Sequence, residues 1–241
     1  KSHSPDELII YSKPKMGKTD LVSRIEDCGI IELEKGANYV EGFVHDVSNL
    51  EELDKVMTWL EKENPYKYIV FDTLTRLEEW CEIEGTLNYM NSVQGKKFNR
   101  VTEEHVEMGL APANRLGQQF PVGHQCFESV NTLPQGFGYR WSRESYKKWF
   151  ERMRALSGRK IYLAHIKDKF IESKQGEQVS GRDIDLTGKL KSISTSFSDT
   201  IAYLNRGSDG NTYLSFQAGE AVAEGSRSKH LTGQNILVGE W

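Results

Sequence analysis

The sequence predicts an α/β fold in which a mostly parallel central sheet is flanked by helices. Short apolar runs with the composition of strands alternate with segments whose apolar residues recur at helical spacing. The first apolar run, Leu8–Tyr11, leads through a short loop into Gly17-Lys18-Thr19 and then into a helical pattern. Because strands that alternate with helices form parallel sheets, we expect residues 1–241 to fold as a single α/β domain.

The composition is typical of a globular protein with a sizeable core. Hydrophobic residues make up 37% of the 241 residues, and charged residues make up 27%. The formal net charge is −4, so contact with nucleic acid requires a local basic patch. Three cysteines without paired spacing fit a reducing compartment, and no apolar run approaches the roughly 18 residues of a membrane span. We therefore expect a cytoplasmic protein without a membrane partner.

The first predicted strand and helix enclose a candidate phosphate-binding loop. Backbone N–H groups at the start of a helix favour an anion, and the strand, loop and helix order is the context that such a loop needs. Lys18 would reach the β- and γ-phosphates of ATP, and the hydroxyl of Thr19 would hold Mg²⁺. The expected nucleotide-binding residues are Ser12, Lys13, Pro14, Lys15, Met16, Gly17, Lys18, Thr19 and Asp20.

One position of this loop departs from the usual pattern. Ser12 stands five residues before Gly17, where the pattern has glycine. Serine lacks the freedom of glycine at positive φ, so we expect an effect on nucleotide affinity and none on the fold. The alternative is a surface turn with a chance Gly-Lys-Thr, which the flanking strand and helix make the weaker interpretation.

Further elements follow in alternation up to residue 80. The apolar spacing predicts a strand at 29–33, a connection at 45–50 and a helix at 50–60. A third strand at 68–71 runs into Asp72, and a helix with apolar residues follows within 74–80.

The alternation of predicted strands and helices stops at about 85–141, a segment that is rich in Gly, Asn, Gln and Pro. The segment carries the basic residues Lys96, Lys97 and Arg100, and a short helix is expected within 101–110. Long irregular segments are usually functional or mobile, so we expect an insertion over the functional edge of the sheet.

Regular patterns return in the last hundred residues. We expect a helix at 142–156, a strand at 160–164 that ends in His165, and a polar hairpin at 166–186. A helix or turn at 186–197 precedes two strands within 200–216 that flank Ser-Asp-Gly, a turn signal typical of an antiparallel hairpin.

Two carboxylates follow predicted strands and are candidates for catalysis. Asp72 would bind Mg²⁺ through water or order its ligands, and the alternative is a cap for the next helix. Glu34 follows the second strand, near the edge where parallel sheets place their ligands, and could orient and deprotonate an attacking water. The alternative for Glu34 is a solvated charge, and Glu32 is a close competitor for the role of base.

The strand after the insertion ends in polar and basic residues. His165 could contact the γ-phosphate and so change the conformation of the following loop, or it could have only a structural role. Lys167 and Lys169 on that loop could contact phosphate or nucleic acid, although basic loop residues are commonly just solvated.

Five segments follow one another along the chain: SKPKMGKT at 12–19, IELEKGA at 31–37, YIVFDTLTRLEEW at 68–80, IYLAHIKDKF at 161–170 and LTGKLKSISTSFSDTIAYL at 186–204. In this order they resemble the RecA-like ATPases of phage genomes, often described as phage nucleotide-binding proteins. The first and third are widespread in P-loop proteins, whereas their combination with the last two is more specific. The resemblance implies a RecA-like P-loop fold with a long insertion and a C-terminal antiparallel hairpin.

The same resemblance implies a function. It matches Glu34 to the residue that activates water and His165 to the sensor. It implies Mg²⁺-dependent ATP hydrolysis linked to single-stranded DNA in phage-type recombination, annealing or replication, in the cytoplasm of the host cell. It also implies homo-oligomers, rings or filaments, that share ATP sites between subunits, and a single-strand-binding protein is a further candidate partner. The expected DNA contacts are Lys96, Lys97, Arg100, Lys167 and Lys169.

Shared ATP sites imply a cation supplied by the neighbouring subunit. Arg227 and Lys229, in a Gly- and Ser-rich loop, are the preferred candidates, and Lys189 with Lys191 is the alternative. Three other functions stay open: a ring-forming helicase or DNA-packaging motor, a nucleotide-gated DNA-binding module with little turnover, and a nucleotide kinase. The kinase is the least favoured, because no convincing Arg-rich lid is visible.

Overall fold

The computed structural model describes residues 4–35, 40, 42–98, 103–109, 117–119, 121–123, 129–172, 178–218 and 223–240. The chain forms two compact units. The first contains residues 1–77 and 149–241, and the second contains residues 78–148.

The first unit is built on a sheet that has ten strands among the described residues. Their order is β10-β8-β7-β1-β5-β4-β2-β3, with β6 paired to β5 and β9 paired to β7. Neighbours from β7 to β3 pair in parallel, and the pairs that involve β6, β8, β9 and β10 are antiparallel. This arrangement confirms the predicted α/β class and the C-terminal antiparallel strands. The strands are β1 (Glu7–Ser12), β2 (Cys28–Glu32), β3 (Phe43–Asp46), β4 (Tyr68–Asp72), β5 (Arg159–Glu172), β6 (Gln178–Ile184), β7 (Thr200–Arg206), β8 (Thr212–Ser215), β9 (Gly225–Ser226) and β10 (Asn235–Leu237).

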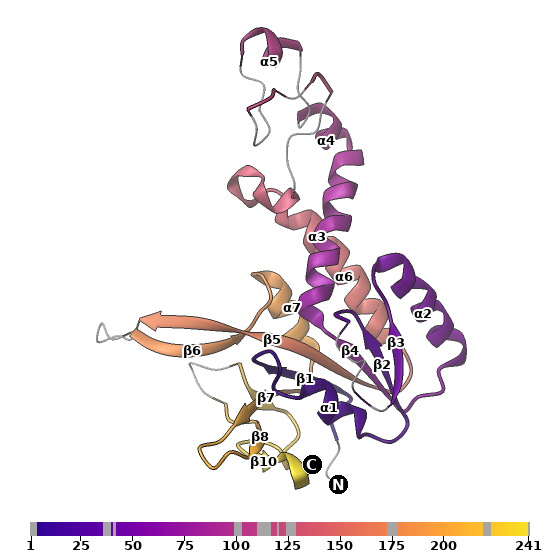
Figure 1. Cartoon of the computed structure of the whole chain (residues 1–241), viewed down its shortest axis with the longest axis vertical. Coiled ribbons are helices and arrows are strands. Elements are labelled where there is room, and N and C mark those ends of the chain that lie inside the picture. The colour runs from indigo at the N-terminus through magenta and orange to yellow at the C-terminus, as the bar shows by residue number, and fades with distance from the viewer. Residues whose placement is uncertain are drawn as a thin grey trace. The chain divides into compact units, whose positions relative to one another are not determined.

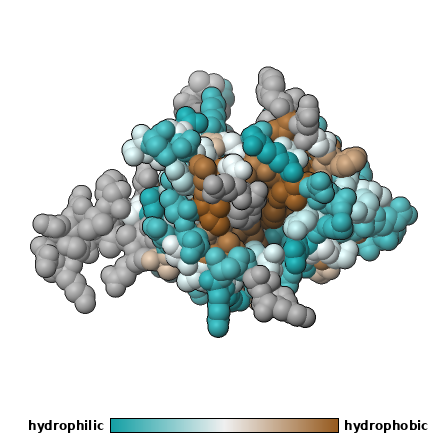
Figure 2. Space-filling model, turned by 90° about the horizontal axis from the view of Figure 1, so that it is seen from below, coloured by the Kyte–Doolittle hydropathy of each residue, from teal (hydrophilic) through white to brown (hydrophobic). Residues whose placement is uncertain are grey.

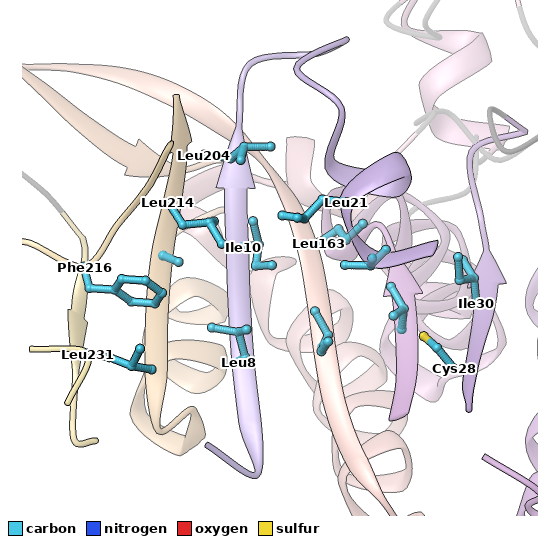
Figure 3. Close-up of a cluster of buried hydrophobic side chains, with 14 residues drawn as sticks. Leu8, Ile10, Leu21, Cys28, Ile30, Leu163, Leu204, Leu214, Phe216 and Leu231 are labelled. Carbon is cyan, nitrogen blue, oxygen red and sulfur yellow. The ribbon is translucent and has the colours of Figure 1, made fainter. Parts of the chain in front are cut away.

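Both faces of the central strands are covered, which explains why β1 is apolar from Leu8 to Tyr11. Leu8, Ile10 and Leu163 lie on one face, where Leu21 of α1 (Lys18–Ser23) packs beside them (Figure 3). On the other face, the rings of Phe150 and Tyr162 lie 5.1 Å apart. The described helices of this unit are α1, α2 (Leu50–Glu63), the first turn of α3 (Leu74–Asn91), the C-terminal part of α6 (Tyr139–Ala155), α7 (Lys189–Phe197) and the short η4 (Val238–Glu240).

Strand β5 differs from its prediction, because it runs on for seven residues past His165. Figure 1 shows β5 as a long strand with β6 beside its far end. Its parallel pairing with β1 reaches the pair Ser12–His165, and its antiparallel pairing with β6 begins at Ile166–Ile184. His165 therefore marks a change of partner within one strand and is not a strand end. The predicted hairpin is confirmed, and its tip at 173–177 lies outside the described residues.

The sequence does not predict strand β3, because residues 45–50 have the pattern of a connection. It has only four residues and pairs with β2 alone among the described strands. Its terminal residues, Phe43 and Asp46, are exposed. A short edge strand with exposed ends has no apolar pattern to reveal it.

In the second unit, the irregular segment begins later than residue 85, because α3 (Leu74–Asn91) continues through Gly85. A Cβ atom at Gly85 would lie 2.7 Å from the backbone nitrogen of Ser142, so this glycine permits close packing against the start of α6. The expected helix within 101–110 is present as α5 (Glu103–Glu107). The other helical segments of this unit are α4 (Val93–Phe98), η2 (Val130–Thr132) and η3 (Pro134–Gly136).

The surface carries both polar and apolar areas. Figure 2 shows apolar side chains at the centre of one face of the molecule, inside a surround of hydrophilic ones. No helix within the described ranges is both long and apolar enough to cross a bilayer.

Candidate functional site

The carboxyl ends of four parallel strands meet at one edge of the sheet. Register pairs Ser12 with His165, and Asp72 pairs with Glu32 on one side and Leu163 on the other. Open parallel sheets bind their ligands at this edge. A pocket of about 410 Å³ opens here. It is lined by Pro14, Lys15, Met16, Gly17, Lys18, Thr19, Asp20, Glu32, Glu34, Asp72 and His165.

The loop after β1 has the backbone of a phosphate-binding turn. Gly17 has φ 85° and Lys15 has φ 61°, so the chain turns through the left-handed region twice before α1. A Cβ atom at Gly17 would meet nothing within 4 Å. Its backbone conformation, and not crowding, is therefore what favours glycine here.

Ser12 is accommodated because it ends a strand. Its pairing with His165 is that of an extended residue, and it is not among the described residues with positive φ. The fully buried hydroxyl accepts a hydrogen bond from Nζ of Lys18 at 3.1 Å and donates one to the carbonyl of Lys13 at 2.8 Å. Serine at this position therefore holds the lysine that we expect to contact phosphate.

Lys18 itself is buried, with 7% of its surface exposed. Burial lowers the pKa of Lys18 from its ordinary value, while the negative charges of Asp72 and Glu34 act in the opposite direction. An anion in the pocket would stabilise the charged form of this amine.

Thr19 and Asp72 form the second part of the site. The hydroxyl of Thr19 donates to Oδ2 of Asp72 at 2.6 Å. Burial raises the pKa of Asp72, although the hydrogen bond from Thr19 opposes this effect. A buried carboxylate beside a hydroxyl is a pair of hard oxygen donors, which suits Mg²⁺.

The described residues contain no cluster of three or more His, Cys, Asp or Glu that could enclose a metal ion. Mg²⁺ usually keeps several waters and is bound by one or two carboxylates together with substrate phosphates. The Thr19–Asp72 pair fits that kind of site.

Glu34 stands at the centre of a third group. Its Oε1 accepts a hydrogen bond from the hydroxyl of Thr73 at 2.5 Å, and Nε2 of His165 lies 3.0 Å from the same atom. Burial raises the pKa of Glu34, but the hydrogen bonds from His165 and Thr73 and the charge of Lys18 outweigh it, so the pKa is lower than its ordinary value. Glu34 is therefore ionised at neutral pH.

The backbone of His165 connects this group to two other elements. Its N–H donates to the hydroxyl of Thr75 at 3.2 Å, and its carbonyl accepts from the N–H of Asp185 at 2.9 Å. Nδ1 of the ring is buried and has no hydrogen-bond partner among the described residues, so Nε2 is the better place for the hydrogen that faces Glu34.

Thr73 is the residue of this group that the sequence did not reveal. It follows Asp72, and its side chain is buried and 39 positions from Glu34 in the sequence. Only the pairing of β2 with β4 brings the two together, so no local pattern could have identified the contact.

The predicted DNA contacts fall in different parts of the chain. Lys167 lies on β5 with an exposed side chain, 3.9 Å from a carboxylate oxygen of Asp185. Lys169 also lies on β5, and Lys96 and Lys97 lie on α4. The side chains of these three lysines, and the whole of Arg100, lie outside the described residues.

The predicted trans cations lie away from the pocket of their own chain. Strand β9 pairs with β7 at Thr200, which is the partner of Leu8 near the start of β1. Arg227 follows directly, and its guanidinium donates to the carbonyl of Ser196 at 3.1 Å. Arg227 and the exposed Lys229 are thus near the opposite edge of the sheet from the phosphate loop.

Comparison with known families agrees with this geometry. Residues 4–108 match a family model described as an AAA domain. The match covers less than half of the chain and includes the phosphate loop, Glu34 and Asp72, whereas His165 lies beyond it. This part of the chain is similar to nucleotide-binding ATPase domains with a P-loop. No curated protein matches the chain.

Proposed function

We propose that this protein binds ATP with Mg²⁺, hydrolyses it, and uses the cycle to act on single-stranded DNA in phage-type recombination, annealing or replication. The observation that carries the ATPase proposal is the meeting of Lys18, Thr19–Asp72 and Glu34 around one pocket. The similarity to an AAA domain supports nucleotide binding. The DNA and phage parts rest on the sequence resemblance.

Each side chain has a defined part in this proposal. Lys18 binds the β- and γ-phosphates, and Thr19 and Asp72 hold Mg²⁺, which when bound neutralises charge on the phosphates. Glu34 is ionised and 32% exposed, so it can accept a proton from water. His165 orients Glu34 through Nε2.

The proposed DNA contact is the β5–β6 hairpin, because it begins directly at His165 and carries Lys167 and Lys169. The proposed assembly is a homo-oligomer in which Arg227 and Lys229 of one subunit reach the ATP of the next. A cation supplied in this way by a neighbouring subunit raises the rate of phosphoryl transfer by roughly 10³–10⁵-fold. An Arg227→Ala/Lys229→Ala subunit mixed with a Lys18→Ala subunit should then regain activity that neither has alone. Mixtures that co-assemble and stay inactive would exclude this arrangement.

One observation favours a second candidate, a nucleotide-gated binding module with little turnover. Nε2 of His165 lies within 3.1 Å of both carboxylate oxygens of Glu34, and Thr73 also donates to one of them. A base held in this way has less freedom to bind water. A single-turnover measurement separates the two functions, because a gated module binds ATP tightly but converts little of it.

The deciding experiment measures ATP binding and hydrolysis, with and without single-stranded DNA, in the wild type and in Lys18→Ala. We expect Lys18→Ala to abolish hydrolysis and weaken binding, because the buried amine is the cation in the loop. Lys62→Ala is the matched control, since Lys62 is an exposed lysine in the last turn of α2. Near-normal turnover by a folded Lys18→Ala protein would contradict the site.

A further inference from the structure

A buried carboxylate outside the pocket joins three strands. The side chain of Glu224 is fully buried. Its Oε1 accepts hydrogen bonds from the hydroxyl of Tyr11 at 3.0 Å and from Nη2 of Arg182 at 3.1 Å. Its Oε2 accepts one from the hydroxyl of Ser215 at 2.8 Å. A buried charge needs such partners, so Glu224 fixes the relative positions of β1, β6 and β8.

Two of these strands lead directly to functional elements. Tyr11 immediately precedes Ser12, whose hydroxyl holds Lys18 in the phosphate loop. Arg182 lies on β6 and pairs with Asp168 in the β5–β6 hairpin. Glu224 therefore accepts a hydrogen bond from the strand that leads into the phosphate loop, and it forms an ion pair with the proposed DNA-binding hairpin.

Ring packing reinforces the same connection. The guanidinium of Arg182 lies over the ring of Tyr203, 4.3 Å from its centre, and that ring lies 5.2 Å from the ring of Tyr11. Burial and the negative charge of Glu224 raise the pKa of Tyr11, so its hydroxyl remains a donor. A shift of the hairpin relative to β1 must disturb the ion pair and the ring contact together.

The two partners of the ion pair differ in exposure. The side chain of Arg182 is 41% exposed, whereas Glu224 is fully buried. A coupling between two sites requires an element with two arrangements. The second arrangement that the proposal below assumes has Arg182 turned from Glu224 to water or to an anionic ligand, while Tyr11 and Ser215 still donate to the carboxylate.

We propose that Glu224 is a positioning residue that couples the phosphate loop to the β5–β6 hairpin, so that nucleotide in the pocket and a ligand on the hairpin change each other's affinity. The proposal rests on the nucleotide binding proposed above. By linkage the effect is reciprocal, and such couplings typically amount to roughly 5- to 150-fold.

The test is hydrogen exchange of the backbone in 166–172 and 178–184, with and without a non-hydrolysable ATP analogue and Mg²⁺. In the wild type we expect nucleotide to change exchange in these segments by about 5-fold or more. Tyr11→Phe removes the hydroxyl but keeps the ring, and should reduce that response to less than about 2-fold. Ser215→Ala is the matched control, because it also removes a donor to the carboxylate of Glu224. Ser215 lies on β8, which carries neither the phosphate loop nor the hairpin. The change in hydrogen exchange caused by nucleotide should therefore remain that of the wild type in Ser215→Ala.

A second variant and a binding measurement separate the outcomes. Arg182→Lys keeps the charge but loses the planar contact with Tyr203, and should weaken the response as Tyr11→Phe does. Affinity for a fluorescent ATP analogue is measured for every variant. Absence of binding by the wild type would contradict both the proposed function and the coupling. Two results would contradict the coupling and leave the proposed function standing. The first is normal binding of the ATP analogue by the wild type with no change in hydrogen exchange at the hairpin. The second is an equal change in hydrogen exchange in Tyr11→Phe and Ser215→Ala.

Discussion

Nε2 of His165 lies 3.0 Å from Oε1 and 3.1 Å from Oε2 of Glu34, across 131 positions of sequence. The contact joins the predicted sensor to the predicted base. It arises because β5 lies between β1 and β4, so that His165 stands at the edge of the sheet where β2 ends. A group that contacts His165 at this edge can thus also affect Glu34.

Replacement of the base should separate binding from hydrolysis. Glu34→Gln keeps the size of the side chain but cannot accept a proton from water. We expect nucleotide affinity close to that of the wild type and a rate lower by roughly 10²–10⁴-fold. Glu32→Gln is the comparison, because Glu32 lines the same pocket. Loss of rate in Glu32→Gln with full rate in Glu34→Gln would place the base at Glu32.

The pH dependence should report the hydrogen bond from His165. In the wild type the pKa of Glu34 is lower than its ordinary value, so the base stays ionised as the pH falls. His165→Ala removes that hydrogen bond, and the pKa of Glu34 should rise. We therefore expect the acid limb of kcat/KM to move to higher pH. The exposed His230, changed to alanine, serves as control, and an unmoved acid limb in His165→Ala would refute the assignment.

The same shift has a consequence for stability. A carboxylate whose pKa is lower in the folded state stabilises the protein above its unfolded pKa, and this contribution is lost as the pH falls through the folded pKa. Thr73→Val removes one donor to Glu34 with little change of shape. The same hydroxyl accepts the backbone N–H of Arg76 at 3.2 Å, and the loss of that hydrogen bond is the same at every pH. We therefore expect Thr73→Val to be less stable than the wild type at both pH values, with the larger loss at neutral pH, as measured by urea unfolding. Thr73→Ser should behave as the wild type, and an equal loss at both pH values would mean that Glu34 makes no contribution.

Asp72 should control the requirement for Mg²⁺. Asp72→Asn retains an oxygen beside Thr19 but removes the negative charge. We expect hydrolysis to need a higher Mg²⁺ concentration, with ATP binding without metal less affected. Titration of activity with Mg²⁺ measures this, and a titration curve equal to that of the wild type would remove Asp72 from the metal site.

Salt dependence should identify the DNA contacts. Each phosphate contact with single-stranded DNA contributes about 0.7 to the slope of log affinity against log salt. Replacement of Lys167 and Lys169 by alanine should flatten this slope by about 1.4 if both contact phosphate. The pair Lys96 and Lys97 is tested in the same way, with Lys62→Ala as control. A pair whose replacement leaves the slope unchanged makes no phosphate contact.

The sequence by itself determined the parts of the protein that depend on local pattern. The apolar run before Gly17 and the helical spacing after it indicated the strand, loop and helix of the candidate phosphate site. The positions of Asp72 and Glu34 after apolar runs indicated the edge of a parallel sheet. These predictions succeed because a buried parallel strand must be apolar along its length, and a polar residue marks its end.

The tertiary structure decided which side chains meet. The contacts of Glu34 with Thr73 and His165, and of Glu224 with Tyr11 and Arg182, join residues far apart in the chain. They depend on strand order and register, which no local spacing encodes. Gly85 and His165 illustrate the same limit, because each was interpreted as an end of regular structure. Gly85 instead lies inside α3 where another backbone approaches closely, and His165 lies inside β5 where the strand exchanges one neighbour for another.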